Sequence, residues 1–208
     1  MICFPADRAP RGARSLALVG ALLLAPLGIV AAQQPSSGHG NMPGMDHAQM
    51  ATDRPAPRDS NQAFLRMNSD HHQGLIQLAD TALAHATRAT TKADAHKLRD
   101  KQAGEQRMML GMLRRQYTDT ITPMVLPSNQ AFLDTLSHAS GATVDPTFYR
   151  LVVEHHREGI AMINRMLPSL TGQVRAMALK GRAEQQREIP EMERKMTRLE
   201  GRTAAAGR

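Results

Sequence analysis

Cysteine is almost absent from this sequence, which has one, Cys3, among its 208 residues. Cys3 precedes an N-terminal apolar run that ends in a small-residue cleavage signal, so removal of this leader would remove the only thiol. The remaining chain can then form neither a disulfide nor a thiolate metal site. Any metal ion must be bound through nitrogen, oxygen or thioether ligands.

Aromatic residues are also scarce, because tryptophan is absent and aromatic side chains make up only 3% of the chain. Few rings are available to stack on bases, and the net charge of +7 is spread over segments rich in both signs. We therefore expect no nucleic-acid partner. The sequence also lacks a glycine-rich phosphate loop, a nucleophile elbow and a His-Glu-x-x-His zinc motif, which disfavours the enzyme classes built on them.

Long apolar runs are confined to the N-terminus. Arg8, Arg11 and Arg14 precede an apolar segment, residues 16–30, and small residues follow up to Ala32. This order is typical of a signal peptide, so we predict a signal peptide over residues 1–32 and a bacterial protein that is periplasmic or secreted. Glycine and proline interrupt the apolar segment and disfavour the alternative, an uncleaved anchor. No stable membrane span is expected after cleavage.

Residues 33–58 are rich in Gln, Pro, Ser, Gly, Met and His and have no apolar period, so we predict a disordered linker. The segment from His39 to Met50 holds two histidines and three methionines in twelve residues. Short His-rich tracts suggest metal binding, and His with Met but without Cys favours copper over zinc. A low-complexity spacer is the equally weighted alternative.

The remainder of the chain shows the spacing of amphipathic helices and no strand-like alternation. Predicted helices cover Ser60 to about Ala86, Lys92 to Tyr117, Ser128 to Ser140 (short), Asp145 to about Leu167, and Ser169 to Glu200 with Pro190 inside it. This pattern predicts an all-α, ferritin-like four-helix bundle over residues 59–200, made of two related helical hairpins at 59–122 and 141–200. Residues 201–208 are expected to form a frayed tail.

A repeated histidine pair organises the two halves. His155-His156 follows Phe148, and His71-His72 follows Phe64 at the same spacing, each pair with an acid directly before it. Both pairs lie within the apolar stripe of their helix, so the imidazoles should point toward the interior. One such histidine is most often a hydrogen-bonded core residue, but two pairs at matching positions favour a functional site.

The second half carries a further motif, Gln185-x-x-Glu188-Ile189 with Met192 three residues on. With the His-His helix, this motif resembles the family known as domain of unknown function 305, exported bacterial proteins with a ferritin-like helical bundle. In the first half, the matching alignment places Glu105 where Gln is expected and Met108 where Glu is expected. Some members of this family are associated with copper binding or tolerance, so the resemblance implies metal binding more than any reaction.

Histidines and methionines supply the candidate ligands. Imidazole suits divalent copper, zinc and nickel, and thioether suits Cu(I), although methionine also fills helical cores well. Of the acids, Glu188 and Glu154 could orient imidazoles, and for Asp70 a surface or helix-end role is preferred. The predicted metal ligands are His71, His72, His155, His156, Met67, Met108, Met112, Met162, Glu188 and Met192.

The ligand set favours some functions over others. A ferritin-like di-iron centre needs Glu-x-x-His on two helices, whereas this chain has only the reverse order, His155-x-x-Glu158, in one half. The first hypothesis is therefore an exported protein that binds and sequesters a copper ion, with other transition metals open. The alternatives are a non-catalytic envelope protein whose histidines are core packing, and a bundle-metal oxidoreductase. The sequence favours no catalysed reaction and leaves homo-oligomerisation and one shared site for both pairs open.

Overall fold

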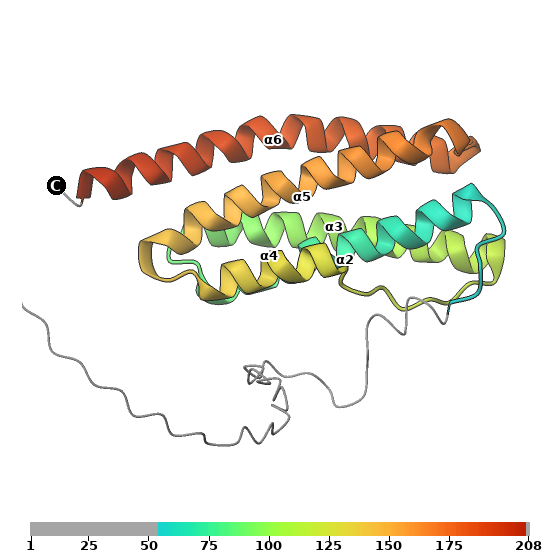
Figure 1. Cartoon of the computed structure of the whole chain (residues 1–208), viewed down its shortest axis with the longest axis horizontal. Helices are drawn as coiled ribbons and strands as arrows, with labels where there is room; N and C mark the ends of the chain where they lie inside the picture. Colours follow the sequence, from blue (N-terminus) through green and yellow to red (C-terminus); the bar gives the residue numbers. More distant parts are fainter. Residues whose placement is uncertain (1–53, 207–208) are drawn as a thin grey trace, which may run out of the picture. The chain divides into compact units, whose positions relative to one another are not determined.

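The computed structural model describes residues 54–206, which form helices, turns and loops without a strand. The all-α prediction is confirmed. The helices are α2 (Ser60–His85), α3 (Ala89–Tyr117), α4 (Pro127–His138), α5 (Val144–Met166) and α6 (Gly172–Ala206), with 3₁₀ turns at Gly141–Thr143 and Leu167–Ser169 (Figure 1). None of these helices is long and apolar enough to span a membrane. The predicted signal peptide and the His39–Met50 segment lie outside the described residues.

Helix boundaries differ from the predicted ones mainly at α6. This helix starts at Gly172 instead of Ser169, because Leu167–Ser169 forms a 3₁₀ turn and Gly172 adopts a positive φ of 53°. At its other end α6 continues to Ala206, so the tail predicted to fray from Gly201 is helical over most of its length. The run of alanines before residue 207 favours this extension, because alanine has the highest helix propensity.

The four long helices form two antiparallel hairpins, α2 with α3 and α5 with α6. The hairpins meet mainly through α2 and α5, and the short helix α4 packs on both of these (Figure 1). α3 and α6 lie on the outside of this central pair and reach one another through long side chains such as Lys101 and Glu188. The two His-His helices are therefore direct neighbours.

Helix starts are held by carboxylates. Asp59 caps α2, because its side chain accepts a hydrogen bond from the backbone N–H of Gln62 at 2.8 Å. α3 has no side-chain cap of its own, and the buried Asp145 at the start of α5 takes this role. Asp145 accepts bonds from the backbone N–H groups of Thr87 and Arg88, both at 3.2 Å, so it also ties the two hairpins together.

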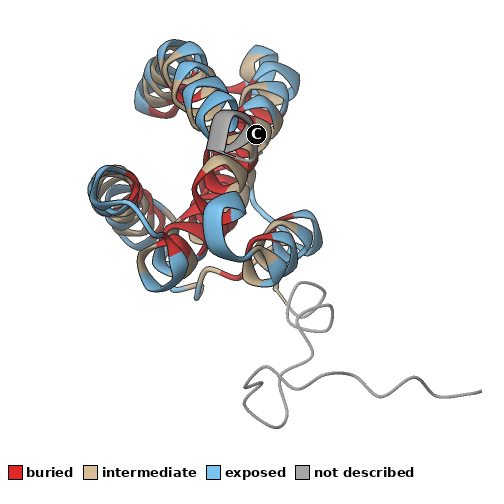
Figure 2. Cartoon of the chain, turned by 90° about the vertical axis from the view of Figure 1, so that its left-hand side faces the viewer, coloured by how far each residue is buried: buried red, intermediate tan, exposed pale blue. Residues whose placement is uncertain are grey.

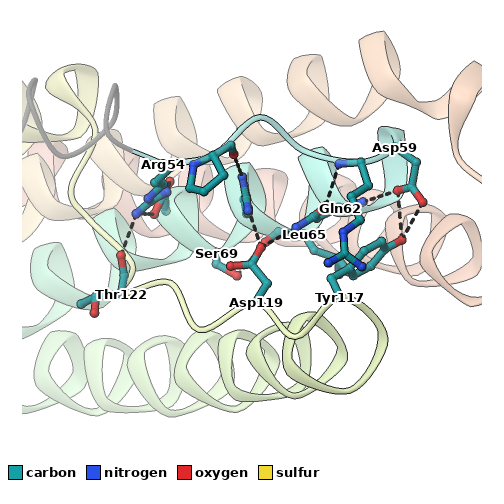
Figure 3. A network of polar contacts seen from close by, with 12 residues as sticks. Arg54, Asp59, Gln62, Leu65, Ser69, Tyr117, Asp119 and Thr122 are labelled. Atoms are coloured by element: carbon teal, nitrogen blue, oxygen red, sulfur yellow. Dashed lines mark hydrogen bonds and ion pairs between the residues drawn. The ribbon is translucent and has the colours of Figure 1, made fainter.

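A polar network fixes the segment before α2 to the loop that follows α3 (Figure 3). Arg54 contacts Asp70 at 2.6 Å and the carbonyl of Thr122 at 2.6 Å, and Tyr117 donates to Asp59 at 2.9 Å. Asp70 is buried and faces this network, so its predicted role in surface solvation or at a helix end is wrong. The sequence did not reveal Arg54 as its partner.

The core consists of two apolar clusters with a polar layer between them. Phe64, Leu65 and Leu113 belong to one cluster, and Phe148 and Leu151 belong to the other. The buried residues of the four long helices lie mainly on the sides of the helices that face one another (Figure 2). Between the clusters lie buried polar residues that belong to neither: Asn68, His71, His72, Gln102, Asn129, His155, His156 and Gln185.

Candidate metal centre

The four repeated histidines meet in the polar layer. Because α2 and α5 are neighbours, the inner faces of both helices bring the pairs together, and all four residues are at most 3% exposed. The rings of His71 and His155 are stacked, with centroids 3.8 Å apart and an interplanar angle of 27°. The two pairs thus form one cluster with a residue of each half at its centre, as expected if they share a site.

Each outer histidine of the cluster meets a glutamate from the second helix of its own hairpin. His72 Nε2 lies 3.0 Å from Glu105 Oε2, and His156 Nε2 lies 2.9 Å from Glu188 Oε2. The first contact is a hydrogen bond, whereas in the second the ring nitrogen is close to the carboxylate without pointing at it. Carboxylates beside imidazoles are the usual partners that orient metal-binding histidines.

The position of Glu105 corrects the alignment of the first half. Glu105 occupies the place of Glu188, so the motif there reads Gln102-x-x-Glu105 with Met109 as its methionine. The predicted alignment, which placed Glu105 opposite the glutamine, is wrong by three residues. Gln102 and Gln185 are both buried, as are Met109 and Met192. The Gln-x-x-Glu spacing in the sequence was the signal that could have identified Glu105.

Most nitrogens of the cluster lack a hydrogen-bond partner in the protein. His72 Nε2 bonds to Glu105, and His155 Nδ1 lies 3.1 Å from Asn129 Oδ1. The other buried ring nitrogens have none: both nitrogens of His71, both of His156, Nδ1 of His72 and Nε2 of His155. Buried polar atoms are nearly always hydrogen-bonded, so the unpaired imidazole nitrogens of this layer are available to water or to a metal ion.

Two glycines create the space that the cluster occupies. A Cβ atom on Gly159 would lie 2.7 Å from Gln185 Oε1 and 2.9 Å from His71 Cε1. A Cβ atom on Gly74 would lie 2.3 Å from the side-chain nitrogen of Asn129, which holds His155. All three distances are shorter than real Cβ contacts, so a larger residue at either position would push the neighbouring side chains away.

Burial keeps the central imidazoles neutral. Burial, followed by the neighbouring His72 and His156, lowers the pKa of His71 to about 3. Burial, followed by His71, holds the pKa of His155 well below its usual value. A neutral imidazole has a free lone pair, which is the form that binds a metal ion.

The flanking glutamates stay ionised. Burial alone would raise the pKa of Glu188, but its contacts with His156 and Lys101 outweigh burial and lower the pKa to about 2. Burial also acts to raise the pKa of Glu105, and the hydrogen bond with His72 lowers it overall. Lys101 lies 2.6 Å from Glu188, so an ammonium group balances part of this negative charge.

The structure separates the predicted methionine ligands. Met112 and Met162 are buried in the apolar cluster around Phe64, and Met67 packs against that cluster. Met192 is buried in the opposite apolar cluster. Met108 is 55% exposed and, like Met109, lines the same cleft as His72.

The polar layer contains atoms that could bind a metal ion, but they are not arranged around a common point. Within residues 54–206, no group of three or more His, Cys, Asp or Glu side chains is arranged to hold a metal ion. His71 and His155 stack face to face, and the glutamates bind from the outside. Ligation of one ion by several of these histidines therefore requires rotation of the rings.

Comparisons with known proteins agree with this architecture. A family model described as a domain of unknown function, DUF305, matches the chain twice in succession, over residues 25–113 and 114–196. A DUF305 fragment from Deinococcus radiodurans is 24% identical, with a TM-score of 0.60 over 69% of this chain and 99% of that one. A DUF305 protein from Streptomyces coelicolor is 21% identical, with a TM-score of 0.57 over 64% of this chain and 88% of that one.

A third similar structure is that of CopM in its Cu(II)-bound form. It is 21% identical, with a TM-score of 0.57 over 66% of this chain and 96% of that one. CopM has also been solved in Cu(I)-bound and Ag-bound forms. No curated protein matches the sequence. At these identities the similarities show a common helical fold.

Proposed function

The chain belongs to the DUF305 family, and from this premise and the four-histidine layer we propose that it is an exported protein that binds copper. His71, His72, His155 and His156 supply the nitrogen ligands. Glu105 and Glu188 hold the outer two rings from outside. The bound ion is cargo that the protein sequesters or passes on.

The observation that carries this proposal is the set of unpaired imidazole nitrogens. A histidine that only fills a core keeps its ring nitrogens bonded to protein groups, because an unpaired buried polar atom costs about 1–3 kcal/mol. Besides His156 Nε2, which lies beside Glu188, five such nitrogens lie in one layer here, next to two glycines that leave room for the rings. A structural envelope protein, the alternative function, offers no reason for this arrangement.

Ligand chemistry supports copper as the ion. Four imidazole nitrogen donors suit copper better than iron of the di-iron type, which needs several carboxylate ligands. The thioethers of Met108 and Met109, which line the cleft at His72, are donors suited to Cu(I). CopM, a similar helical protein, is known with bound Cu(I), Cu(II) and silver. The predicted leader supports export to a compartment outside the cytoplasm.

Copper content tests the proposal directly. The chain of residues 33–208 would be loaded with Cu(I) under anaerobic, reducing conditions, desalted and measured by mass spectrometry of the metal. We expect a variant with all four histidines changed to glutamine to lose copper relative to the wild type, while a chain that starts at Arg54 keeps it. Equal copper content in the wild type and the four-glutamine variant would refute the proposal.

A further inference from the structure

A cleft between α3 and α6 leads from the surface to one side of the histidine layer. α3 and α6 make few backbone contacts, so a space of about 50 Å³ remains between their side chains. His72 and Gln185 line this cleft, and so do Met108, Met109 and Met177. The cleft is therefore open to solvent at one end and bounded by a histidine of the proposed copper site at the other.

Buried polar atoms without partners line the walls of the cleft. Asn68, His72, Gln102 and Gln185 are each at most 7% exposed. Each has one atom that bonds to nothing in the protein: Asn68 Oδ1, His72 Nδ1, Gln102 Oε1 and Gln185 Oε1. Buried polar groups need partners, so these four atoms are available to water or to an ion between the helices.

The outer part of the cleft presents thioethers. Met108 is 55% exposed, which is unusual for a large apolar side chain in this protein, where most are buried. Met177 is partly buried on the facing helix, and Met109 lies deeper, with its sulfur accepting a hydrogen bond from Asn68 at 3.2 Å. Thioether binds Cu(I) and other soft monovalent ions and has little affinity for hard cations.

The charges at this cleft are balanced. Lys101 and Lys180 line it together with Glu105 and Glu184. Lys101 lies 3.2 Å from Glu184, and Lys180 lies 3.8 Å from the same carboxylate. A hydrated divalent cation is therefore not concentrated here by an acidic rim, and the thioethers provide the selective attraction.

We propose that this cleft is the entrance to the copper site, and that Met108 at its mouth captures Cu(I) before the ion passes to His72. This inference rests on the proposed function and adds the route and the oxidation state. Copper would then enter the histidine layer from one side, because the cleft reaches His72 of the α2 pair and no histidine of the α5 pair.

Gly181 offers a way to close the cleft without disturbing the core. It lines the cleft on α6, and a Cβ atom placed on it would have no heavy atom within 4 Å. A Gly181→Phe variant would place a bulky ring at the edge of this cleft, and its Cβ atom would meet no neighbour. Gly201, on the same helix and equally free of neighbours, provides the matched control Gly201→Phe.

The experiment follows the transfer of Cu(I) from its bathocuproine disulfonate complex to the full chain without its leader, by stopped-flow loss of the complex's absorbance. We expect Gly181→Phe to slow transfer by roughly tenfold or more, because access limits the association rate, and to leave the final amount transferred unchanged. Gly201→Phe should transfer at the wild-type rate. Met108→Leu, which keeps the bulk of the side chain and removes the sulfur, should also slow transfer.

Wild-type transfer rates in Gly181→Phe and Met108→Leu would overturn the proposed entrance while leaving copper binding intact. A wild-type chain that takes up no Cu(I) would overturn the proposed function itself, and the entrance with it. Circular dichroism of each variant checks its helical content. Met108 is on the surface, so Met108→Leu tests the proposal even if Gly181→Phe folds poorly.

Discussion

At the scale of single residues, the histidine layer depends on side chains that the protein leaves unbonded and on glycines that leave them room. Gly159 is the clearest case, since it lies in the middle of α5 and against both Gln185 and His71. Glycine normally weakens a helix relative to alanine by about 1 kcal/mol. Its presence here is explained by the close approach of the site.

Replacing Gly159 with alanine should therefore lower the free energy of unfolding, whereas a glycine-to-alanine change within a helix usually raises it. The added methyl group would force Gln185 and His71 apart, and overpacking of this kind costs about 1–3 kcal/mol of the free energy of unfolding. Gly181→Ala, at an open position on α6, should instead stabilise the protein by about 0.5–1 kcal/mol. Urea unfolding of both variants checks this, and a stabilised Gly159→Ala would show that the layer is not tightly packed.

At the scale of helices and loops, buried carboxylates tie loop and helix-start segments to the bundle. Asp145 starts α5 and bonds the backbone at the start of α3, where no local cap exists. Arg54 joins Asp70 of α2 to the loop after α3. Asp145 therefore joins the second hairpin to the first, whereas Arg54 and Asp70 hold the loop after α3 against the first hairpin.

Asp145→Asn is expected to destabilise the fold by about 2–3 kcal/mol. The amide keeps the shape of the carboxylate but loses its charge and one acceptor, and bonds to charged groups contribute about 1.5–3 kcal/mol each. The matched control is Asp134→Asn, because Asp134 is exposed on α4 and accepts a single side-chain bond from Gln130. If thermal unfolding shifts equally in both variants, Asp145 does not hold the hairpins together.

The helices and the inward direction of both histidine pairs were predictable, because apolar spacing and the repeated Phe and His-His positions depend only on local sequence. The partner of His72 was not found. His72 and Glu105 are 33 residues apart, whereas His156 and Glu188 are 188 − 156 = 32 residues apart. An alignment of the two halves without a gap therefore does not place Glu105 opposite Glu188. Helical spacing did not separate Met112, Met162 and Met192, which lie in the apolar clusters, from Met108 at the cleft, because thioethers that fill a core have the same spacing as ligands.

At the scale of the whole molecule, the buried His71 and His155 at the centre of the polar layer make stability depend on pH. The pKa of His71 is 6.5 in an unfolded chain and about 3 in the fold, so between these values the unfolded state binds the extra proton. The pKa of Glu188 is lowered to about 2, so this residue also reduces the stability of the fold as the pH decreases below 4.5. Acid therefore favours unfolding, and no compensating gain is expected from these groups.

The free energy of unfolding of the metal-free protein should fall as the pH decreases from about 6.5 toward 3, by at most about 1.4 kcal/mol per pH unit for each such group. His71→Phe should reduce this slope, because it removes one buried group that must stay neutral. Urea titrations at several pH values, with an exposed histidine variant such as His138→Phe as control, provide the measurement. A flat profile in the wild type would contradict a buried neutral His71.

If histidines from both halves form one copper site, Cu(I) affinity in a double-mutant cycle of His71 and His155 will show it. Chelator competition would be performed on the wild type, His71→Ala, His155→Ala and the double variant, over residues 33–208. We expect each single variant to lose the same high-affinity ion. The Cu(I) affinity of the double variant should be only slightly lower than that of either single variant. Wild-type affinity and stoichiometry in both single variants would show instead that the stacked histidines are core residues.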